Sequence, residues 1–412
     1  MYKTITPAEI YGIFDTGRSY GGLGLHYTID DLVRLAKRDN NTVRPYLYVN
    51  PLQGKHIPAS PEKIMDVCYQ IATLINDAYP NERLYVIGFA ETATGIASAI
   101  SHYLNNVVFY QNTTREYKEN EDVLYFTESH SHATDQNLRV SGLQDHIGEV
   151  ERIIFIDDEV TTGNTICKLI DVIKQTFGEN DIHFSIASVL NSMTKERVSH
   201  LEEEGIDCLF LAQLPFEYKK ESILDIRYEP FRDISVVSDD PIDAEILEYE
   251  AAVDSRTFCR FAEYDDENER FSKKVIAAIG NDHYKDMLIL GTEECMYPSI
   301  CLGHMISESG LADSVRVHAT TRSPIIASGE PDYPLHHRYQ LRSLYDRDRK
   351  TFIYNLARYD KVILVTDADQ LAEGASDLIT ALKNAGNDNI LIAKWKYRKA
   401  GRFKKKNGFA DT

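Results

Sequence analysis

The stretch that decides the fold runs from residue 152 to residue 166 and reads RIIFIDDEVTTGNTI. Four apolar residues at 153–156 are followed at once by Asp157 and Asp158. A short turn rich in threonine comes next, and apolar residues then recur at the spacing of one helix face, at Ile166, Leu169, Ile170 and Ile173. The stretch therefore predicts a buried strand, a loop and a helix, with two carboxylates where the strand ends.

We expect the loop after this strand to bind an anion. It has neither the lysine of a Walker-type phosphate loop nor the three glycines of a dinucleotide-binding fingerprint. It offers hydroxyl groups, a glycine that permits close approach, and the unpaired N–H groups at a helix N-terminus, which together suit a phosphate monoester. The residues of this predicted phosphate loop are Thr161, Thr162, Gly163, Asn164 and Thr165.

Asp157 and Asp158 need a different role, because carboxylates repel a phosphate group. They can accept hydrogen bonds from the vicinal hydroxyls of a ribose, or hold a hydrated Mg²⁺ ion that offsets the charge. A 5-phosphoribosyl group, with a phosphate at one end and a diol at the other, satisfies the loop and the carboxylates together. The alternative is an acidic pair that only caps a turn at the end of a strand.

Strand-like and helix-like segments alternate through the first 220 residues. The predicted strands are residues 84–90, 107–111, 153–156 and 181–190. Strands joined through helices by short links pair in parallel, so the pattern predicts an α/β fold with an open parallel sheet. Ligands of such sheets bind at the carboxyl ends of the strands.

The second half of the chain repeats the first in three places. The aligned pairs are YVIGFAETATGIASAI (85–100) with LILGTEECMYPSICLG (288–303), NTTREY (112–117) with ATTRSP (319–324), and RIIFIDDEVTTGNT (152–165) with KVILVTDADQLAEGAS (361–376). The order and approximate spacing agree, which predicts a second α/β domain that is a degenerate copy. In the copy, Asp367 aligns with Asp158, Thr366 replaces the first aspartate, and the threonine-rich loop is lost, so we expect one phosphoribosyl site, in the first domain.

Composition limits the class of protein. The chain of 412 residues has a formal net charge of −19, which opposes nucleic-acid binding. It has no apolar run long enough to span a membrane and no secretory signal at its beginning. Its six cysteines form no CxxC pair. We therefore expect a cytoplasmic protein with a small-molecule ligand; a homodimer is compatible with the sequence.

The segment IIFIDDEVTTGNT closely resembles the phosphoribosyl-pyrophosphate (PRPP) motif of type I phosphoribosyltransferases. The resemblance implies that Asp157 and Asp158 contact the ribose hydroxyls and that residues 161–165 hold the 5′-phosphate. It also implies a type I phosphoribosyltransferase-like fold, with Mg²⁺ accompanying PRPP.

Further motifs extend this resemblance over nearly the whole chain. They are VNPLQGKHIP (49–58), GFAETATG (88–95), TTREY (113–117), FTESHSHA (126–133) and HATTRSP (318–324). Together they resemble a bacterial two-domain family, in which an orotate phosphoribosyltransferase-like domain precedes a domain named for its Thr-Arg-Ser-Pro (TRSP) motif. Members are typically encoded near tellurium-resistance and stress-response genes, and the family is thought to help make a nucleoside-like metabolite.

The sequence turns acidic and less periodic between Ser222 and Gly280, and this change suggests the domain limits of the chain. Residues 1–225 would form the phosphoribosyltransferase-like domain, including an N-terminal hood that selects the base. Residues 226–280 would be an acidic linker or helical connection, residues 281–393 the TRSP-motif α/β domain, and residues 394–412 a basic tail.

Two motifs of the first domain are candidates for binding pyrophosphate. By resemblance, a loop after the first strand contacts pyrophosphate, and here its residues would be Glu91, Thr92, Thr94 and Gly95. The alternative is an ordinary turn in which Thr94 caps the helix. Arg115 could grip pyrophosphate or a substrate carboxylate through two hydrogen bonds, or could form a surface ion pair with Glu116 or Glu119.

Three further groups of residues are weaker candidates. The long polar segment 111–149 is typical of a lid. In such a lid, His130 and His132 could act as acid, base or pyrophosphate ligand. The alternatives are that the two histidines belong to a metal site, or that the segment is a solvated loop. Lys55 and His56 belong to the predicted substrate hood. Arg322 and Asp367 could bind a phosphorylated ligand in the second domain, or that domain could simply pack on the first.

The predicted function is that of a Mg²⁺-dependent phosphoribosyltransferase, in which a base nitrogen attacks PRPP and pyrophosphate leaves. Related 6-oxopurine enzymes have an aspartate at the first position of the phosphate loop. Here that position is Thr161, which favours an orotate-like or unfamiliar base. The alternatives are a non-catalytic PRPP or nucleotide sensor, and an interaction protein whose second domain docks partners.

Overall fold

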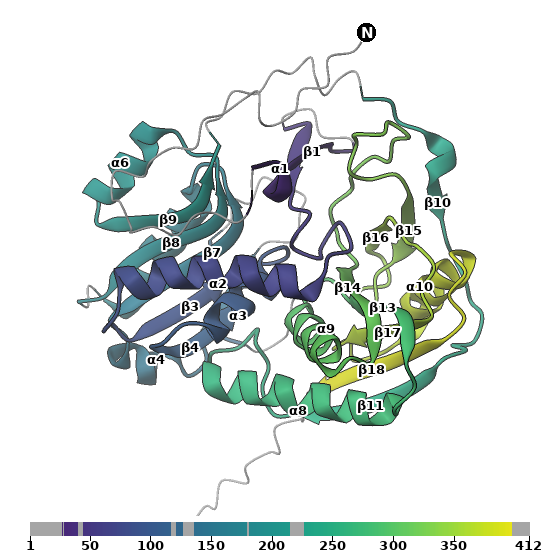
Figure 1. The fold of residues 1–412 in the computed structure, drawn as a ribbon. Helices are drawn as coiled ribbons and strands as arrows, with labels where there is room; N and C mark the ends of the chain where they lie inside the picture. Colours follow the sequence, from purple (N-terminus) through teal and green to yellow (C-terminus); the bar gives the residue numbers. More distant parts are fainter. Residues whose placement is uncertain are drawn as a thin grey trace, which may run out of the picture.

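The fold is that of a computed structural model, which describes residues 27, 29–39, 44–116, 121–126, 136–178, 181–214 and 226–397. Figure 1 shows two α/β layers side by side, the first coloured purple to teal and the second green to yellow. Among the described residues, no helix is both long and apolar enough to cross a membrane.

The first sheet is parallel apart from one edge strand. Its strand order is β12-β4-β3-β7-β8-β9, and only β12 pairs in the antiparallel sense. The strands are β3 (Leu84–Gly88), β4 (Val107–Asn112), β7 (Arg152–Val160), β8 (His183–Asn191), β9 (Ile206–Gln213) and β12 (Cys259–Arg260).

Helices cover both faces of this sheet, and small elements surround it. The helices are α2 (Pro61–Ala78), α3 (Thr94–His102), α4 (Leu143–His146), η2 (Ile147–Glu149), α5 (Asn164–Phe177) and α6 (Lys195–Glu203). The small elements are α1 (Ile29–Leu32), β1 (Arg34–Lys37), β2 (Tyr46–Val49), β5 (Val123–Tyr125) and β6 (Asn137–Arg139). Helix α2 starts where the Ser60 hydroxyl accepts from the Lys63 N–H, with Pro61 in the first turn.

The second sheet is entirely parallel, with the order β11-β18-β17-β13-β14. Its strands and helices are β11 (Glu245–Ala251), β13 (Tyr284–Gly291), β14 (Ala312–Ala319), β17 (Lys361–Thr366), β18 (Ile390–Tyr397), α8 (Phe261–Ile279), α9 (Tyr297–Ser309) and α10 (Ala372–Asn384). A small sheet lies beside it, made of β10 (Asp233–Ser235), β15 (Arg338–Arg342) and β16 (Lys350–Tyr354), and η3 (Pro230–Arg232) precedes β10.

The predicted duplication is confirmed by the topology. Strands β4-β3-β7-β8 of the first sheet correspond to β14-β13-β17-β18 of the second, in the same order and all parallel. Helices α3 and α9 follow the equivalent strands β3 and β13. Both domains are α/β, as the sequence predicted.

The alternation of side chains along the strands explains how the two α/β halves share a core. On β3, Val86 faces a central apolar cluster while Tyr85 faces the opposite side of the sheet. On β13, Ile289 faces the same central cluster and Leu290 faces away. Strands buried on both faces read as continuous apolar runs, which is why their sequences were recognisable.

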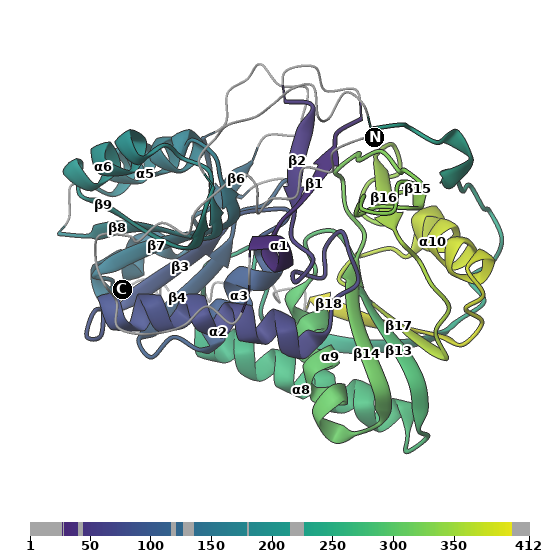
Figure 2. The ribbon, with the colours of Figure 1, turned by 45° about the horizontal axis from the view of Figure 1, so that its top comes forward.

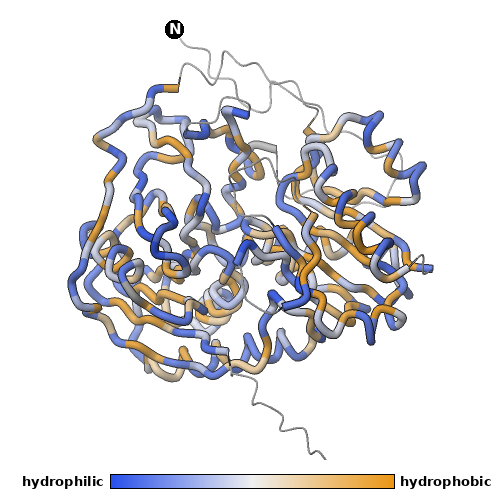
Figure 3. The backbone as a smooth tube through the Cα atoms, turned by 180° about the vertical axis from the view of Figure 1, so that it is seen from behind, coloured by the Kyte–Doolittle hydropathy of each residue, from blue (hydrophilic) through white to orange (hydrophobic). Residues whose placement is uncertain are grey.

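Helices from both halves meet in this central cluster. Helix α9 contacts α2, α3 and α8, and Figure 2 shows α2, α8 and α9 close together below the sheets. The tube in Figure 3 is mostly hydrophobic along the strands of both halves. Tyr110 stacks on Tyr264, which in turn packs edge-on against Trp395 of the second sheet. One continuous core therefore joins the two domains.

The segment predicted as an acidic connection, residues 226–280, contributes to both sheets. Strand β12 pairs with β4 of the first sheet, and β11 pairs with β18 of the second. At the other end, β18 runs to Tyr397, past the predicted start of the basic tail at residue 394. The domain limits themselves stay predictions.

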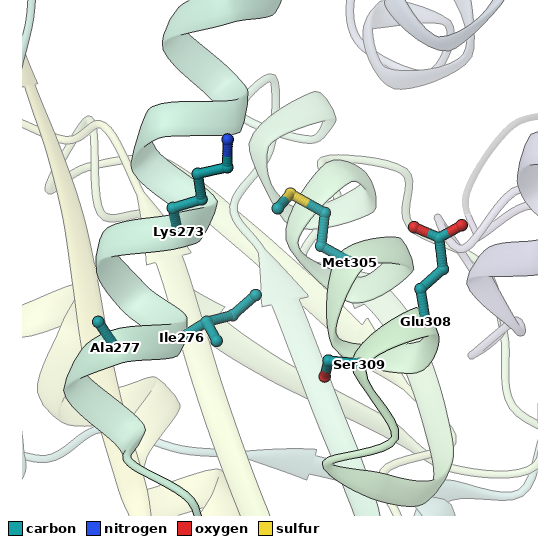
Figure 4. Close-up of a pocket in the computed structure, with 6 residues that line it drawn as sticks. All are labelled: Lys273, Ile276, Ala277, Met305, Glu308 and Ser309. Atoms are coloured by element: carbon teal, nitrogen blue, oxygen red, sulfur yellow. The ribbon is translucent and has the colours of Figure 1, made fainter.

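A hollow lies between α8 and α9 on the outside of the molecule. Figure 4 shows Lys273, Ile276 and Ala277 of α8 facing Met305, Glu308 and Ser309 of α9. None of the residues that the sequence predicted as ligand-binding lines this hollow.

Candidate active site

Strand β7 brings Asp157 and Asp158 to the carboxyl edge of the first sheet. Asp157 lies beside Ser188 of β8, and the Asp158 N–H donates to Oδ1 of Asp157 over 2.9 Å. Both side chains are half-buried, as is Glu159, the next residue. Three consecutive carboxylates therefore stand at the end of one strand.

The three carboxylates have raised pKa values because they are buried. Burial raises the pKa of Asp157 well above its ordinary value, and the charge of Asp158 raises it further. Burial also raises the pKa values of Asp158 and Glu159, although Arg44 opposes both shifts. A ligand that donates hydrogen bonds or positive charge here would stabilise the ionised carboxylates.

Arg44 is a residue of this site that the sequence motifs missed. Its Nη2 lies 2.6 Å from Oε1 of Glu159, and it lies just before β2 of the N-terminal hood. Arg38, after β1, is close enough for Arg44 and Glu159 to affect its pKa, which burial lowers. Only the fold joins these arginines to a strand more than a hundred residues away, so no local motif could have found them.

The predicted phosphate loop is open to solvent. Thr162, Asn164 and Thr165 are exposed, and α5 begins at Asn164. Gly163 has φ +71°, and a Cβ at this position would lie 3.3 Å from Sδ of Met193. Glycine is therefore favoured by the backbone angle, and a larger residue would also press on the Met193 side chain.

A cation that the sequence did not predict flanks this loop. Arg197, on α6, donates from Nε to the Thr162 carbonyl over 3.1 Å and from Nη2 to Oδ1 of Asn164 over 3.4 Å. The loop thus places a helix N-terminus next to a guanidinium, an arrangement that suits a phosphate, and the Asn164 N–H donates to Oγ1 of Thr162 over 3.3 Å.

The predicted pyrophosphate loop lies between β3 and α3 and is largely enclosed. Glu91 is only 8% exposed, and Thr94 and Gly95 are buried. The carbonyl of half-buried Thr92 accepts from Nε2 of Gln53 over 2.7 Å, and the Ala90–Glu91 peptide is cis. Thr94 is the first helical residue rather than the cap, and its hydroxyl donates to the Glu294 carbonyl over 3.0 Å.

Lys55 and His56, the predicted hood residues, lie behind this loop. The Lys55 ammonium is fully buried, 2.7 Å from Oε1 of Glu91, and it donates to the Glu293 carbonyl over 2.5 Å. His56 is also buried, and burial with the nearby charge of Lys55 lowers its pKa to about 3. Neither ring nitrogen of His56 has a hydrogen-bond partner within the described part of the chain.

Arg322 of the TRSP motif reaches the same loop from the second domain. Its backbone N–H donates to Oε2 of Glu91 over 3.1 Å, and its Nε donates to Oε2 of Glu293 over 2.7 Å. Its Nη2 also pairs with Glu116. Burial opposes the charge, but Glu294, Glu293, Glu91 and Glu116 raise the pKa of Arg322.

The loops of the two copies hold one another reciprocally. By the aligned repeats, Glu294 is the counterpart of Glu91, and Arg115 is the counterpart of Arg322. Glu294 accepts from the Arg115 N–H over 2.9 Å, just as Glu91 accepts from the Arg322 N–H.

The threonine before each arginine repeats this symmetry. Thr114 donates its hydroxyl to Oε2 of Glu294 over 2.7 Å. Burial opposes ionisation of Glu91, but Lys55, Arg322 and a hydrogen bond from Thr321 lower its pKa. The two copies are thus related by an approximate two-fold arrangement, like the partners in a symmetric dimer.

Asp367, the second-domain counterpart of Asp158, is held by side chains of its own half. It forms an ion pair with Arg256, and the hydroxyls of Tyr345 and Tyr397 donate to it over 2.5 and 2.8 Å. Burial is the largest single influence and raises the pKa of Asp367, but the Arg256 charge together with hydrogen bonds from Arg256, Tyr345 and Tyr397 lowers it overall. Asp367 is therefore already paired within the protein, and a common ligand of Asp367 and Arg322 stays a prediction.

Arg115 is half-buried between the two sets of acids. Burial lowers its pKa, and the charges of Glu91, Arg322, Glu294 and Asp157 all act on it. No ion pair between Arg115 and Glu116 is present, and Glu119 lies outside the described residues. His130 and His132 also lie outside the described residues.

The fold is that of an α/β protein, and these loops form a candidate ligand site at the carboxyl edge of its first sheet. A family model described as phosphoribosyl transferase matches residues 32–213, and a model described as the TRSP domain C-terminal to that transferase domain matches residues 259–382. The chain belongs to the family in which this phosphoribosyl transferase domain is followed by a TRSP domain. No curated protein matches the chain.

Solved phosphoribosyltransferases are among the similar structures. The adenine enzyme of Giardia lamblia, complexed with 9-deazaadenine, is 11% identical, with 46% of this chain and 97% of that chain covered and a TM-score of 0.33. The adenine enzyme of Trypanosoma brucei, with AMP, pyrophosphate and ribose-5-phosphate, is 13% identical, with 48% and 82% covered and a TM-score of 0.30. At these scores the likeness says nothing about the ligand of this chain.

Proposed function

We propose that the protein is a Mg²⁺-dependent phosphoribosyltransferase with a single PRPP site in its first domain. The observation that carries this proposal is the placement of Asp157 and Asp158 directly before an open helix N-terminus whose loop, residues 161–165, is largely exposed. The family assignment of residues 32–213 supports the class of reaction.

Each end of the substrate has a matching group. The amides and hydroxyls of residues 161–165, with Arg197 beside them, would hold the 5′-phosphate. Asp157 and Asp158 would accept hydrogen bonds from the ribose hydroxyls. Holding the ribose at both ends fixes the anomeric carbon, which is the main contribution such an enzyme makes to a reaction with an oxocarbenium-like transition state.

The acidic end of β7 suits Mg²⁺. Burial raises the pKa values of Asp157 and Asp158, and a bound cation would oppose both shifts. Asp157 and Asp158 would hold the hydrated ion, which when bound neutralises charge on the diphosphate.

The reaction replaces one bond to the anomeric carbon by another. The carbon–oxygen bond to diphosphate breaks, and its electron pair leaves with the diphosphate oxygen. A base nitrogen forms the new bond, and its proton passes to the released diphosphate or to solvent. Thr161 at the start of the phosphate loop carries no charge to assist a 6-oxopurine, so we propose an orotate-like or unusual base as the acceptor.

A PRPP or nucleotide sensor is the second candidate. It is favoured by the enclosure of Glu91, whose carboxylate is already held by Lys55 and by the backbone of Arg322. A sensor needs only the phosphate loop and the aspartates, whereas an enzyme also needs a place for the leaving diphosphate.

Incubation of the full chain with PRPP, Mg²⁺ and a panel of bases, with release of pyrophosphate as the readout, tests the proposal. We expect release with one class of base and its loss in the double variant Asp157→Asn, Asp158→Asn. Calorimetric binding of PRPP without turnover for any base would favour the sensor. An absence of PRPP binding, or binding unaffected in the double variant, would contradict both functions.

A further inference from the structure

Three guanidinium groups meet where the second domain closes over the first. Arg322 and Arg349, both from the second domain, bind the same oxygen of Glu116 and the same oxygen of Glu293. The backbone N–H of Arg115, from the first domain, and Nη2 of Arg322 approach the same oxygen of Glu294, over 2.9 and 3.5 Å. The cluster is thus built from both copies.

Each of these arginines keeps one buried N–H group without a partner. They are Nε of Arg115, Nη1 of Arg322 and Nε of Arg349, as judged from the described ranges of the chain. Buried donors on charged groups are rarely left unpaired, because each one loses its hydration without compensation. A ligand with several oxygens would satisfy donors on three guanidinium groups at once.

We propose that Arg322 and Arg349 of the TRSP domain, together with Arg115, bind the diphosphate end of PRPP. The inference rests on the proposed function, and it assigns to the second domain a direct part in the transferase site. The arrangement of these groups agrees with the order of groups along PRPP. The predicted phosphate loop leads into α5, Asp157 and Asp158 lie near the end of β7, and the charge of Asp157 acts on Arg115. The diphosphate would lie beyond Asp157, on the side of Glu91.

The carboxylates in the cluster hold the arginines in place before the ligand arrives. Glu116 and Glu293 each bridge Arg322 and Arg349, so the two guanidinium groups are fixed relative to one another. Burial also raises the pKa of Glu293. Protonation of that carboxyl would leave more of the positive charge for an anion. Preorganised donors of this kind need little rearrangement when they bind charge.

The reciprocal contacts explain how a residue of another domain is positioned so closely. Glu91 fixes the backbone of Arg322, and Glu294 fixes the backbone of Arg115. The backbone atoms of Arg115 and Arg322 therefore occupy equivalent positions in the two copies, which are related by the approximate two-fold arrangement.

Calorimetry on the full chain separates the two ends of the substrate. Inorganic pyrophosphate with Mg²⁺ probes the arginine cluster, and ribose 5-phosphate probes the phosphate loop and the aspartates. The variants Arg322→Lys and Arg349→Lys keep the charge, and so keep the buried carboxylates paired, but lose the forked donor geometry. Arg342→Lys is the matched control, because Arg342 pairs with Asp377 and Glu373 inside the second domain.

We expect Arg322→Lys and Arg349→Lys each to weaken pyrophosphate binding about ten- to a hundredfold, the effect of losing a hydrogen bond to a charged group. Ribose 5-phosphate should bind each of them as it binds the wild type, and Arg342→Lys should bind both probes normally. Equal binding of pyrophosphate by all variants, or equal weakening of both probes, would overturn the inference alone. Failure of the wild type to bind ribose 5-phosphate would overturn the proposed function as well.

Discussion

Lys55 is the most deeply buried charge of the candidate site, at 0% exposure, and its ammonium pairs with Glu91. Replacing it by methionine, an unbranched side chain one atom shorter, leaves a buried carboxylate without its lysine partner. We expect Lys55→Met to lower the free energy of unfolding by about 3–5 kcal/mol, measured by urea denaturation. Arg83→Met, which removes an exposed pair with Glu151, should have a far smaller effect. Equal effects would show that Lys55 is not held by Glu91.

His56 makes stability depend on pH near neutrality. Its pKa is lowered to about 3 in the folded chain, first by burial and then by Lys55, with Glu91, His318 and Arg38 also facing it. The unfolded chain takes up a proton near pH 6.5. Between these values the unfolded state binds more protons, so the free energy of unfolding falls as the pH drops.

The variant His56→Leu tests this link. It loses no hydrogen bond, because neither ring nitrogen has a partner among the described residues. We expect its free energy of unfolding to fall less than that of the wild type between pH 7 and pH 5. His318, whose pKa is lowered to about 4, should retain part of the dependence. Urea denaturation at a series of pH values measures the slope, and identical slopes would exclude His56 as a source.

Residues of the site differ in how far the sequence predicts them. Asp157, Asp158 and the phosphate loop lie on one short stretch, so a local pattern contains their whole chemistry. Arg44 and Arg349 reach the site only through long-range packing, and nothing next to them in the sequence marks them. Arg322 was predicted as a ligand candidate of the second domain, whereas the structure places it against the first.

At the scale of elements, the turn between β7 and α5 depends on Gly163. Alanine there must adopt a positive φ and also press on Met193. We expect Gly163→Ala to weaken ribose 5-phosphate binding about tenfold or more, because the amides of the loop must shift. Calorimetry provides the measurement.

Gly178 offers the control at the other end of the same helix. It also has a positive φ, but a Cβ there would meet nothing within 4 Å. Gly178→Ala should cost roughly 1 kcal/mol of stability and leave ligand binding unchanged. If both variants bound the ligand equally well, the phosphate would have to lie elsewhere.

The central strands were predictable, and the edge elements were not. β3, β7, β13 and β17 are buried on both faces, so each reads as an apolar run bounded by turns. β11 has the sequence EILEYEA and is mostly exposed at a sheet edge, so its acidic residues resembled a linker. β12 has only two residues, too few for any periodicity.

At the scale of the whole molecule, the shared core should make the two domains unfold together. The cluster around Tyr110, Tyr264 and Trp395 includes strands of both sheets and the segment between them. Loss of either half would expose apolar surface of the other. We expect one calorimetric transition, with equal calorimetric and van't Hoff enthalpies. Two separated transitions would show that the halves are independent.

The reciprocal pairing of Glu91 with Arg322 and of Glu294 with Arg115 has a consequence for how the two halves can change. In a symmetric assembly of identical chains, one mutation alters both sides of the interface at once. Here each side is encoded separately, so position 322 can vary while position 115 stays constant. The first half can therefore retain the proposed ligand-binding residues, while the second half changes in sequence and still keeps its contacts with the first.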